Sequence, residues 1–305
     1  MAHPPFPEVT VVLGDPRRPD ATKVGHVFSA EDLDSVARMK AAFAELDGYR
    51  FRYLDDHDTL LETLRTARPA FVVNFCDTGF NNEAARELEL VAYLDLLGVP
   101  YSGSGPAALA LCYDKALVRL AAAELGVPVP EQTYARADDA NSPRPPRYPA
   151  LVKPNVGDGS VGITAESVVR DEAAAAAYLA RLRREWPGRD ALLQEFLEGT
   201  EYGVGVVGNP GALCVLPAME VDYAGLEAGL PHILSYESKT VPDSPYWSQI
   251  KYRRAQLDDA QRAALEGHAV KLFGRLGLRD YARFDFRADA DGVIKLLEVN
   301  PNPAW

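Results

Sequence analysis

The first hundred residues alternate between two patterns of hydrophobic and polar positions, one typical of strands and one typical of helices. Apolar runs typical of buried strands occur in "EVTVVLGD", "YRFRYLDD" and "AFVVNFCD", and a further short strand is expected at "VPYSG". Helical spacing of apolar residues occurs between them, in "SAEDLDSVARMKAAFAELDG", "TLLETLRTA" and "NNEAARELELVAYLDLLG". Ser29, with Asp32 three positions later, predicts a capping box at the first helix, and Gly48 is expected to end it. This repeat predicts an open parallel sheet in an α/β N-terminal domain over residues 1–104.

The pattern changes after residue 104. A helix is expected at "DKALVRLAAAELGVPVP", followed by a proline-rich, charged loop or domain seam, "ARADDANSPRPPRYP". Strand-like runs "ALVKP" and "ITAESVV" enclose the glycine-rich turn "NVGDGSVG", and an alanine-rich helix is expected from Asp171 to Trp186. These segments form an expected α+β subdomain over residues 105–190.

The last third is mostly strand-like. Strands are expected at "ALLQEFL", "EYGVGVVGN", "ALCVLPAMEVD" and "LSYESKT", then a helix at "LDDAQRAALEGHAVKLFGRLG". Two final strands, "DYARFDFRAD" and "VIKLLEVN", are joined by the turn "ADG". This pattern predicts a second α+β subdomain over residues 191–305.

The composition is that of a soluble multi-domain protein, with 305 residues, 47% hydrophobic and 25% charged. Its 44 acidic and 32 basic residues give a net charge of −12, which argues against nucleic acid or an anionic membrane as a partner. We find no signal peptide and no run of about 18 apolar residues, so a cytoplasmic protein is expected. The 3 cysteines form no CxxC motif and are expected to be buried, without a zinc site or disulfide framework.

The two final strands carry a candidate metal site. Regular alternation places Glu298 and Asn300 on one face, with Leu296 below them. A tight turn between the strands brings Asp285 close to both. The alternative is a solvated polar face, but "VIKLLEVN" is apolar until its end. Three oxygen donors without His or Cys suit Mg²⁺.

The glycine-rich turn is a candidate phosphate site. Lys153 ends the preceding strand, and the turn offers small residues whose backbone N–H groups can approach phosphate oxygens: Gly157, Gly159, Ser160 and Gly162. The spacing is not that of the GxxxxGK[ST] loop, and the turn leads into a strand. An ordinary connecting turn is therefore the alternative.

Five segments in this order resemble the ATP-grasp superfamily, in its D-alanine–D-alanine ligase-like branch. The resemblance covers residues 99–302 and is carried by "PYSGSGPAALALCYDKALVRLAAAELGVPVP", "YPALVKPNVGDGSVGI", "LLQEFLEGTEYGVGVVG", "SYESKT" and "ARFDFRADADGVIKLLEVNPNP". It implies an α/β N-terminal domain followed by α+β ATP-grasp domains, with ATP held between the two α+β subdomains.

For the nucleotide, the resemblance implies that Lys115 and Lys153 hold the α- and β-phosphates. The turn from Gly157 to Gly162 is implied to close over them as a lid. Backbone groups of Glu195 and Leu197 are implied to contact the adenine edge. Glu201 is implied to contact the ribose hydroxyls.

For the chemistry, the resemblance implies that Lys239 faces the γ-phosphate and Arg283 stabilises charge at the reacting carboxyl carbon. Asp285, Glu298 and Asn300 are implied to hold one or two Mg²⁺ ions, with Mn²⁺ as the alternative. The implied reaction joins a small carboxylate, an amino acid for instance, to an amine through an acyl phosphate, giving an amide, ADP and phosphate. The partners are small molecules, and a homodimer is expected.

Two other functions stay open from the sequence. One is an ATP-binding regulatory module without catalysis, against which the joint presence of all the implied metal and phosphate residues argues. The other is an ATP-grasp kinase that phosphorylates a small molecule. Formation of an amide, as opposed to a phosphomonoester or no product, distinguishes the three.

The N-terminal loops depart from the family pattern. "LGDPRRPDAT" and "NFCDTGFNNEAARELE" lack the glutamate and histidine that the family uses to hold its first D-alanine, and Thr240 replaces a family tyrosine. Glu83 or Glu87 could substitute, and Arg17 with Arg18 could hold a carboxylate. D-alanine itself is therefore in doubt as the substrate. Relatives are expected to continue beyond Trp305, where this chain stops.

Overall fold

The computed structural model describes residues 5–139, 143–157 and 159–303. The chain divides into two compact units. One extends to Leu109 and includes the chain from Asn302 onward, and the other spans Ala110–Pro301. Further division of the second unit near residue 190 stays a prediction.

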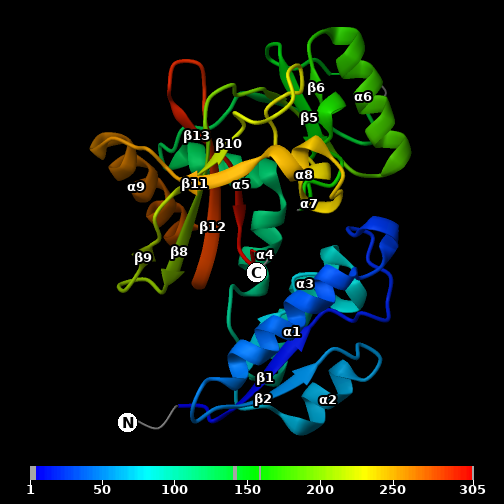
Figure 1. Ribbon diagram of the computed structural model, residues 1–305, viewed down its shortest axis with the longest axis vertical. Helices are drawn as coiled ribbons and strands as arrows, with labels where there is room; N and C mark the ends of the chain where they lie inside the picture. The colour runs from blue at the N-terminus through cyan, green and yellow to red at the C-terminus, as the bar shows by residue number, and fades with distance from the viewer. Residues whose placement is uncertain (1–4, 140–142, 158, 304–305) are drawn as a thin grey trace. The chain divides into compact units, whose positions relative to one another are not determined.

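The first unit is the expected parallel α/β sheet. Its strands β1 (Glu8–Leu13), β2 (Arg50–Leu54) and β3 (Val72–Phe75) pair in parallel in the order β2-β1-β3 (Figure 1, blue to cyan). Its main helices are α1 (Ala30–Ala44), α2 (Leu60–Ala67) and α3 (Glu87–Leu97).

Apolar side chains on both faces of this sheet hold the helices in place. Val11 packs with Val36 and Phe43 of α1 on one face. Val12, on the other face, belongs to a cluster with residues of α2 and α3. Because both faces are covered, the polar residues of the unit gather in the loops that follow the strands.

The capping signal in the sequence correctly predicted where α1 starts. Ser29 and Asp32 form the predicted capping box, whereas the helix ends at Ala44, before Gly48. The expected helix at "NNEAARELELVAYLDLLG" begins only at Glu87. It is preceded by the 3₁₀ turns η2 (Phe80–Asn82) and η3 (Ala84–Arg86). The expected strand "VPYSG" is wrong, because it forms only an isolated bridge between Tyr101 and Val72.

The second unit contains two sheets (Figure 1, green to red). The four-stranded sheet has the order β4-β7-β5-β6, with β4 (Gln132–Ala135), β7 (Ala191–Glu195), β5 (Ala150–Pro154) and β6 (Val168–Val169). Helix α6 (Glu172–Glu185) covers one face, where Tyr178, Leu179 and Leu182 pack on Val152 and Leu193. Lys153, the neighbour of Val152, therefore lies on the opposite face.

The six-stranded sheet has the order β11-β10-β8-β12-β13, and β9 pairs with β8. Its strands are β8 (Glu201–Gly208), β9 (Cys214–Val215), β10 (Met219–Asp222), β11 (Lys251–Arg254), β12 (Asp280–Ala288) and β13 (Ile294–Asn300). Alternate residues of its central strands, including Val204, Phe284 and Phe286, are fully buried. Helices α9 (Asp259–Arg275) and α5 (Lys115–Glu124) contact β8 and β13 respectively.

Several short elements differ from the expectations. "LSYESKT" is not a strand, since Glu237–Thr240 form a single helical turn, α7. "ITAESVV" contains the 3₁₀ turn η4 (Ala165–Ser167), and only its last two residues belong to β6. "ALCVLPAMEVD" divides into β9 and β10.

Other elements had no counterpart in the sequence pattern. They are η1 (Val24–His26), α4 (Pro106–Tyr113), α8 (Pro245–Gln249), β4 and β11. Cys76 and Cys112 are buried as expected, but Cys214 is exposed. Among the described residues, no helix combines the length and apolar character needed to cross a membrane.

Candidate active site

The pairing of β12 with β13 brings the predicted metal donors together. Asp285 lies opposite Glu298, and Arg283 lies opposite Asn300. The Asn300 amide donates to Asp285 Oδ2 at 2.9 Å, and the Arg283 guanidinium donates to both carboxylate oxygens at 2.9 and 3.0 Å. The expected convergence of Asp285, Glu298 and Asn300 is therefore present in the fold.

A β-bulge corrects the expected position of Leu296. Asp285 pairs with Glu298 but the next residue, Phe286, pairs with Leu296, so Leu297 is the extra residue on β13. Leu296 is 3% exposed and lies on the core side with Phe286, not below Glu298. The bulge allows Glu298 to share a face with Asp285 while the strand keeps Leu296 in the core.

Two glycines of the neighbouring strand β8 lie next to these side chains. Gly203 and Gly205 of β8 lie opposite Asp285 and Arg283. A Cβ atom at Gly203 would have no neighbour closer than 3.8 Å, the Oδ1 atom of Asp285. The sheet surface is therefore open at Gly203, next to Asp285, whereas a Cβ atom at Gly205 would lie 3.0 Å from Leu216 Cδ1.

Four cationic side chains act electrostatically on Glu298. Its carboxylate lies 3.8 Å from Lys115 Nζ. Burial alone would raise the pKa of Glu298, but the positive charges nearby outweigh it and lower the pKa to about 2. These cations are Lys115 of α5, Lys153 of β5, Lys239 of α7 and Arg283 of β12. Residues separated by up to 168 positions in the sequence therefore form one charged cluster, from Lys115 to Arg283.

Lys153 is the most buried of these cations, at 3% exposure. Burial lowers its pKa to about 8, and Lys115 adds to this effect, while Glu298 and Glu201 oppose it. An ammonium group held in this way gains stability when further negative charge arrives. The cluster is therefore suited to an anionic ligand.

The glycine-rich turn is attached to the segment that carries Lys239. Ser160 Oγ donates to the Leu234 carbonyl at 2.8 Å, and the Tyr236 N–H donates to the Ile163 carbonyl at 2.8 Å. The Gly157 carbonyl accepts a hydrogen bond from Lys115 Nζ.

The glycines of this turn adopt backbone conformations that other residues rarely adopt. Gly157, Gly159 and Gly162 have φ of +117°, +62° and +75°. A Cβ atom at Gly162 would also lie 2.8 Å from the Pro154 ring. The spacing of these residues is therefore required by the shape of the turn.

The Glu195 side chain is occupied within the protein. Its carboxylate accepts hydrogen bonds from Lys295 Nζ at 2.6 Å and from the Glu131 N–H at 2.9 Å. Leu197 follows in the same segment and is buried. The backbone N–H of Glu195 also donates to the Glu131 carbonyl at 2.9 Å, and a contact of this segment with adenine stays a prediction.

Glu201 is buried and ion-paired. Tyr223 OH donates to Glu201 Oε2 at 2.9 Å, and Arg287 Nη1 lies 3.3 Å from the same oxygen. Burial raises the pKa of Glu201, while Arg287 and Tyr223 oppose that shift. Neither Arg287 nor Tyr223 was assigned a role from the sequence. The only available signal was that Arg287 shares the polar face of its strand with Arg283 and Asp285.

A second polar cluster lies in the loops of the first unit. Asp15 accepts hydrogen bonds from Arg17 and from the His57 N–H, and Asn82 bonds the Asp15 backbone on both sides. Arg18 is paired with Asp58. The two arginines proposed to hold a carboxylate are therefore already bound to aspartates.

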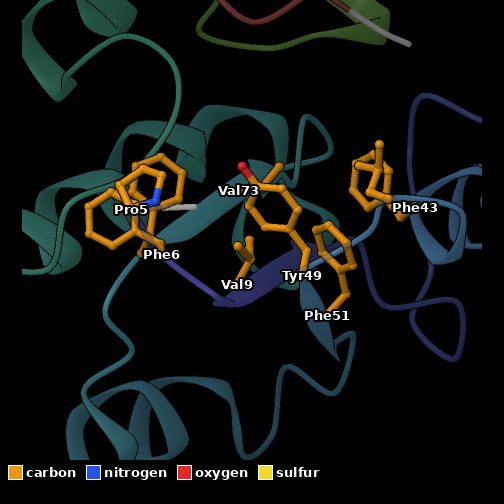
Figure 2. A pocket seen from close by; sticks show the side chains of 9 residues that line it. Pro5, Phe6, Val9, Phe43, Tyr49, Phe51 and Val73 are labelled. Atoms are coloured by element: carbon orange, nitrogen blue, oxygen red, sulfur yellow. The ribbon is translucent and has the colours of Figure 1, made fainter. Parts of the chain in front are cut away.

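The same unit has an apolar pocket of about 270 Å³ near the amino ends of its strands. Figure 2 shows Phe6, Phe43, Phe51 and Tyr49 around it, with Val9 at its base. Among the described residues, its lining consists of aliphatic and aromatic side chains without a carboxylate or a cation. We therefore do not regard it as a catalytic site.

Comparison with protein families gives a match over most of the second unit. The family model described as "D-ala D-ala ligase C-terminus" matches residues 124–305. The D-alanine–D-alanine ligase of Bordetella petrii is 32% identical over 212 residues, which is 69% of this chain and 60% of that protein. The uncharacterized protein y4sG of Sinorhizobium fredii is 30% identical over 215 residues, again 60% of that protein. The chain thus spans about three fifths of these two relatives.

Other relatives match over more of their length. The D-alanine–D-alanine ligase of Xanthobacter autotrophicus is 30% identical over 271 residues, covering 86% of this chain and 80% of that one. Among solved structures, the Bacillus anthracis D-alanine–D-alanine ligase complexed with ATP gives a TM-score of 0.71 at 18% identity. That match covers 99% of this chain and 88% of the other, and it establishes the fold.

Proposed function

Because the chain belongs to the D-alanine–D-alanine ligase family, with the ATP-grasp fold, we propose that it is an ATP-dependent ligase. Its substrates are a carboxylate, an amino acid in the simplest case, and an amine. The products are an amide or dipeptide, ADP and phosphate. The gathering of four cations around Glu298 is the observation that supports this proposal most strongly.

The phosphates of ATP bind to this cationic cluster in the proposal. Lys115 and Lys153 hold the α- and β-phosphates, and Lys239 faces the γ-phosphate. The lid is formed by Gly157, Gly159, Ser160 and Gly162. Transfer of a phosphoryl group to a carboxylate brings two anions together, and fixed cations reduce that repulsion.

The nucleoside half of ATP lies at the neighbouring linker. Backbone groups of Glu195 and Leu197 contact the adenine edge, and Glu201 accepts hydrogen bonds from the ribose hydroxyls. The bonds to Lys295, Tyr223 and Arg287 fix these segments before the ligand arrives.

The residues present fit one or two Mg²⁺ ions, with Mn²⁺ as the alternative. Asp285 and Glu298 offer carboxylate oxygens on the same face of the sheet. The side-chain N–H of Asn300 donates to Asp285, so the side-chain carbonyl oxygen of Asn300 is left for a metal. An ion held by these residues would supply positive charge that offsets the negative charge of the phosphates.

The reaction takes two steps. A carboxylate oxygen of the first substrate attacks the γ-phosphorus, the bond to ADP breaks, and an acyl phosphate forms. The amine nitrogen then attacks the carbonyl carbon, phosphate leaves and the nitrogen loses a proton. In this proposal Arg283, whose Nε and Nη2 donate to Asp285, uses its remaining N–H groups to stabilise the oxyanion that forms at this carbon. The lid keeps water from the acyl phosphate.

A screen of amino-acid pairs tests the proposal. The purified chain is incubated with ATP, Mg²⁺ and pairs of D- and L-amino acids, and ADP, phosphate and amide products are measured. We expect ADP release that requires a particular pair, together with a new amide detected by mass spectrometry. If the chain binds ATP but turns it over with none of the pairs, the result would favour the regulatory module. A phosphomonoester product would favour the kinase.

The substrate identities are not restricted to D-alanine in this proposal. The solved relatives include a D-Ala:D-Ser ligase, VanG of Enterococcus faecalis, with a TM-score of 0.68 at 18% identity. The first-unit loops of this chain hold Arg17 and Arg18 in ion pairs with aspartates. The homodimer and the cytoplasmic location stay predictions from the sequence.

A further inference from the structure

Arg287 is an almost fully buried arginine at the edge of the proposed nucleoside site, with 4% exposure. Its Nε donates to the Gly199 carbonyl at 3.1 Å, and its Nη1 lies 3.3 Å from Glu201 Oε2. The guanidinium carbon lies 5.0 Å from the centre of the Phe196 ring and 5.8 Å from that of Tyr223. One side chain therefore contacts both the linker and the carboxylate.

The hydrogen bonds of this pair are incomplete. Arg287 Nη2 is buried and has no hydrogen-bond partner. In the part of the chain that the structure describes, both hydrogen bonds of Glu201 fall on Oε2. Glu201 Oε1 is therefore left as an acceptor, whereas the unbonded Arg287 Nη2 is covered by protein. A ribose hydroxyl, which donates as well as accepts, can bond to such a carboxylate oxygen.

A purely structural role explains less of this arrangement. An arginine that only stabilises the sheet gains most when all its N–H groups are bonded, since a buried unpaired donor is costly. A matched ion pair exists on the opposite face of the same sheet, where Arg253 donates to the buried Glu220 at 2.6 Å. That arginine is 60% exposed, so water can satisfy its other N–H groups.

We propose that Arg287 is a positioning residue of the nucleoside site. It fixes the Glu201 carboxylate relative to the linker Phe196–Gly199, so that Glu201 can receive the ribose hydroxyls while the linker meets the base. It thereby sets the affinity for the nucleoside and its discrimination between ribose and deoxyribose. This inference rests on the proposed function, because it assumes that the ligand is ATP.

The test uses two variants. Arg287→Lys keeps the charge but replaces the planar guanidinium fork by a single ammonium nitrogen. Tyr223→Phe removes one bond to Glu201. Dissociation constants for ATP, 2′-deoxy-ATP and 3′-deoxy-ATP are measured by calorimetry, and kcat and KM for ATP by ADP release. Arg253→Met is the control, because it breaks an Arg–Glu pair away from this face.

We expect the wild-type chain to bind ATP about 10-fold or more tightly than at least one deoxy analogue, the effect of a hydrogen bond to a charged group. In Arg287→Lys this ratio falls toward 1 and KM for ATP rises, while kcat changes by less than about 3-fold. Tyr223→Phe shows a smaller change in the same direction, and Arg253→Met none.

Two results would overturn the inference separately from the proposed function. One is that Arg287→Lys and Tyr223→Phe both bind ATP as tightly as the wild type and discriminate between ATP and its deoxy analogues to the same extent. The other is a wild-type chain that binds ATP and its deoxy analogues equally. Failure of the wild type to bind any adenine nucleotide would instead refute the proposed function, and this inference with it.

Discussion

Glu298 is the residue at which the charges of the site meet. Its pKa of about 2 shows that the folded chain strongly favours the carboxylate form, because Lys115, Lys239, Lys153 and Arg283 all lie nearby. In the proposed function these cations bind the triphosphate of ATP and offset its negative charge.

Neutralising this carboxylate tests its role. We expect Glu298→Gln to reduce ADP release by about 100-fold or more, since the amide offers one weaker oxygen ligand and no negative charge for a metal. Circular dichroism and urea unfolding check that the variant is folded. The control is Glu220→Gln on the opposite face of the sheet. Full activity in Glu298→Gln would remove Glu298 from the proposed metal site.

The lowered pKa of Lys153 predicts a pH dependence of ATP affinity. An anionic ligand binds the ammonium form, which is present below about pH 8 in the free protein. As the pH rises above 8, binding requires uptake of a proton, so affinity falls by at most tenfold per pH unit. Calorimetry between pH 7 and 9.5, in buffers of different ionisation enthalpy, measures both quantities. Lys153→Met should bind more weakly and lose this dependence; an unchanged profile would contradict the assignment.

At the scale of elements, the bulge in β13 decides which leucine supports the core. Leu296→Ala is expected to lower the free energy of unfolding by about 2–5 kcal/mol, because Leu296 is 3% exposed and packs with the core. Leu297→Ala removes the same atoms from a half-buried side chain and is expected to cost clearly less. Urea unfolding of the two variants compares them directly. The reverse order would mean that β13 alternates regularly without a bulge.

Regular alternation could not reveal that bulge, because the sequence carries no glycine or proline within "IKLLEVN". The helix signals were more informative where they were chemical. Ser29 and Asp32 form the predicted capping box, whereas "LSYESKT" was expected as a strand and is a helical turn. Such short segments contain too few periods for hydrophobic spacing to separate helix from strand.

The glycine-rich turn gives an intermediate case. The sequence predicted the turn, and its three positive φ values explain the glycines. It could not show that Ser160 and Ile163 are bonded to the segment of Leu234 and Tyr236, since these contacts join residues about 70 positions apart. The position of Lys239 beside Glu298 depends on that segment.

At the scale of the whole molecule, the two units differ in what their polar residues do. In the first unit, polar groups of the loops form hydrogen bonds with one another around Asp15. The second unit leaves cations gathered around two carboxylates. Motif spacing indicated Asp285, Glu298, Asn300 and Lys153 of the second cluster, whereas Lys115, Lys239 and Arg283 were implied by the family resemblance alone. It did not reveal Arg287, because an arginine on a polar strand face looks the same whether it is exposed or buried.

Acid sensitivity of the first unit follows from Asp15. Burial would raise its pKa, but hydrogen bonds from Arg17 and from the His57 N–H outweigh burial and hold the pKa well below 3.8. The carboxylate therefore stabilises the folded unit above about pH 4, and this contribution disappears as the pH falls further.

We expect Asp15→Asn to lower the free energy of unfolding by about 1–3 kcal/mol at pH 7 and to weaken its decline between pH 5 and 3. Urea unfolding across this range, with hydrogen exchange of the β1–β3 amides, measures the effect. Asp56→Asn is the control, because Asp56 also pairs with Arg17 but is exposed, and a small change is expected. Equal pH dependence in Asp15→Asn and the wild type would contradict this prediction.

The most direct test of ligase chemistry follows the oxygen of the carboxylate. Amino acids labelled with ¹⁸O in the carboxyl group are supplied with ATP and Mg²⁺, and the released phosphate is examined by mass spectrometry. Attack of the carboxylate on the γ-phosphorus transfers one labelled oxygen to phosphate, and the amide product keeps the other. We therefore expect one ¹⁸O atom per phosphate for each amide formed. ATP turnover that yields only unlabelled phosphate would contradict the acyl-phosphate route.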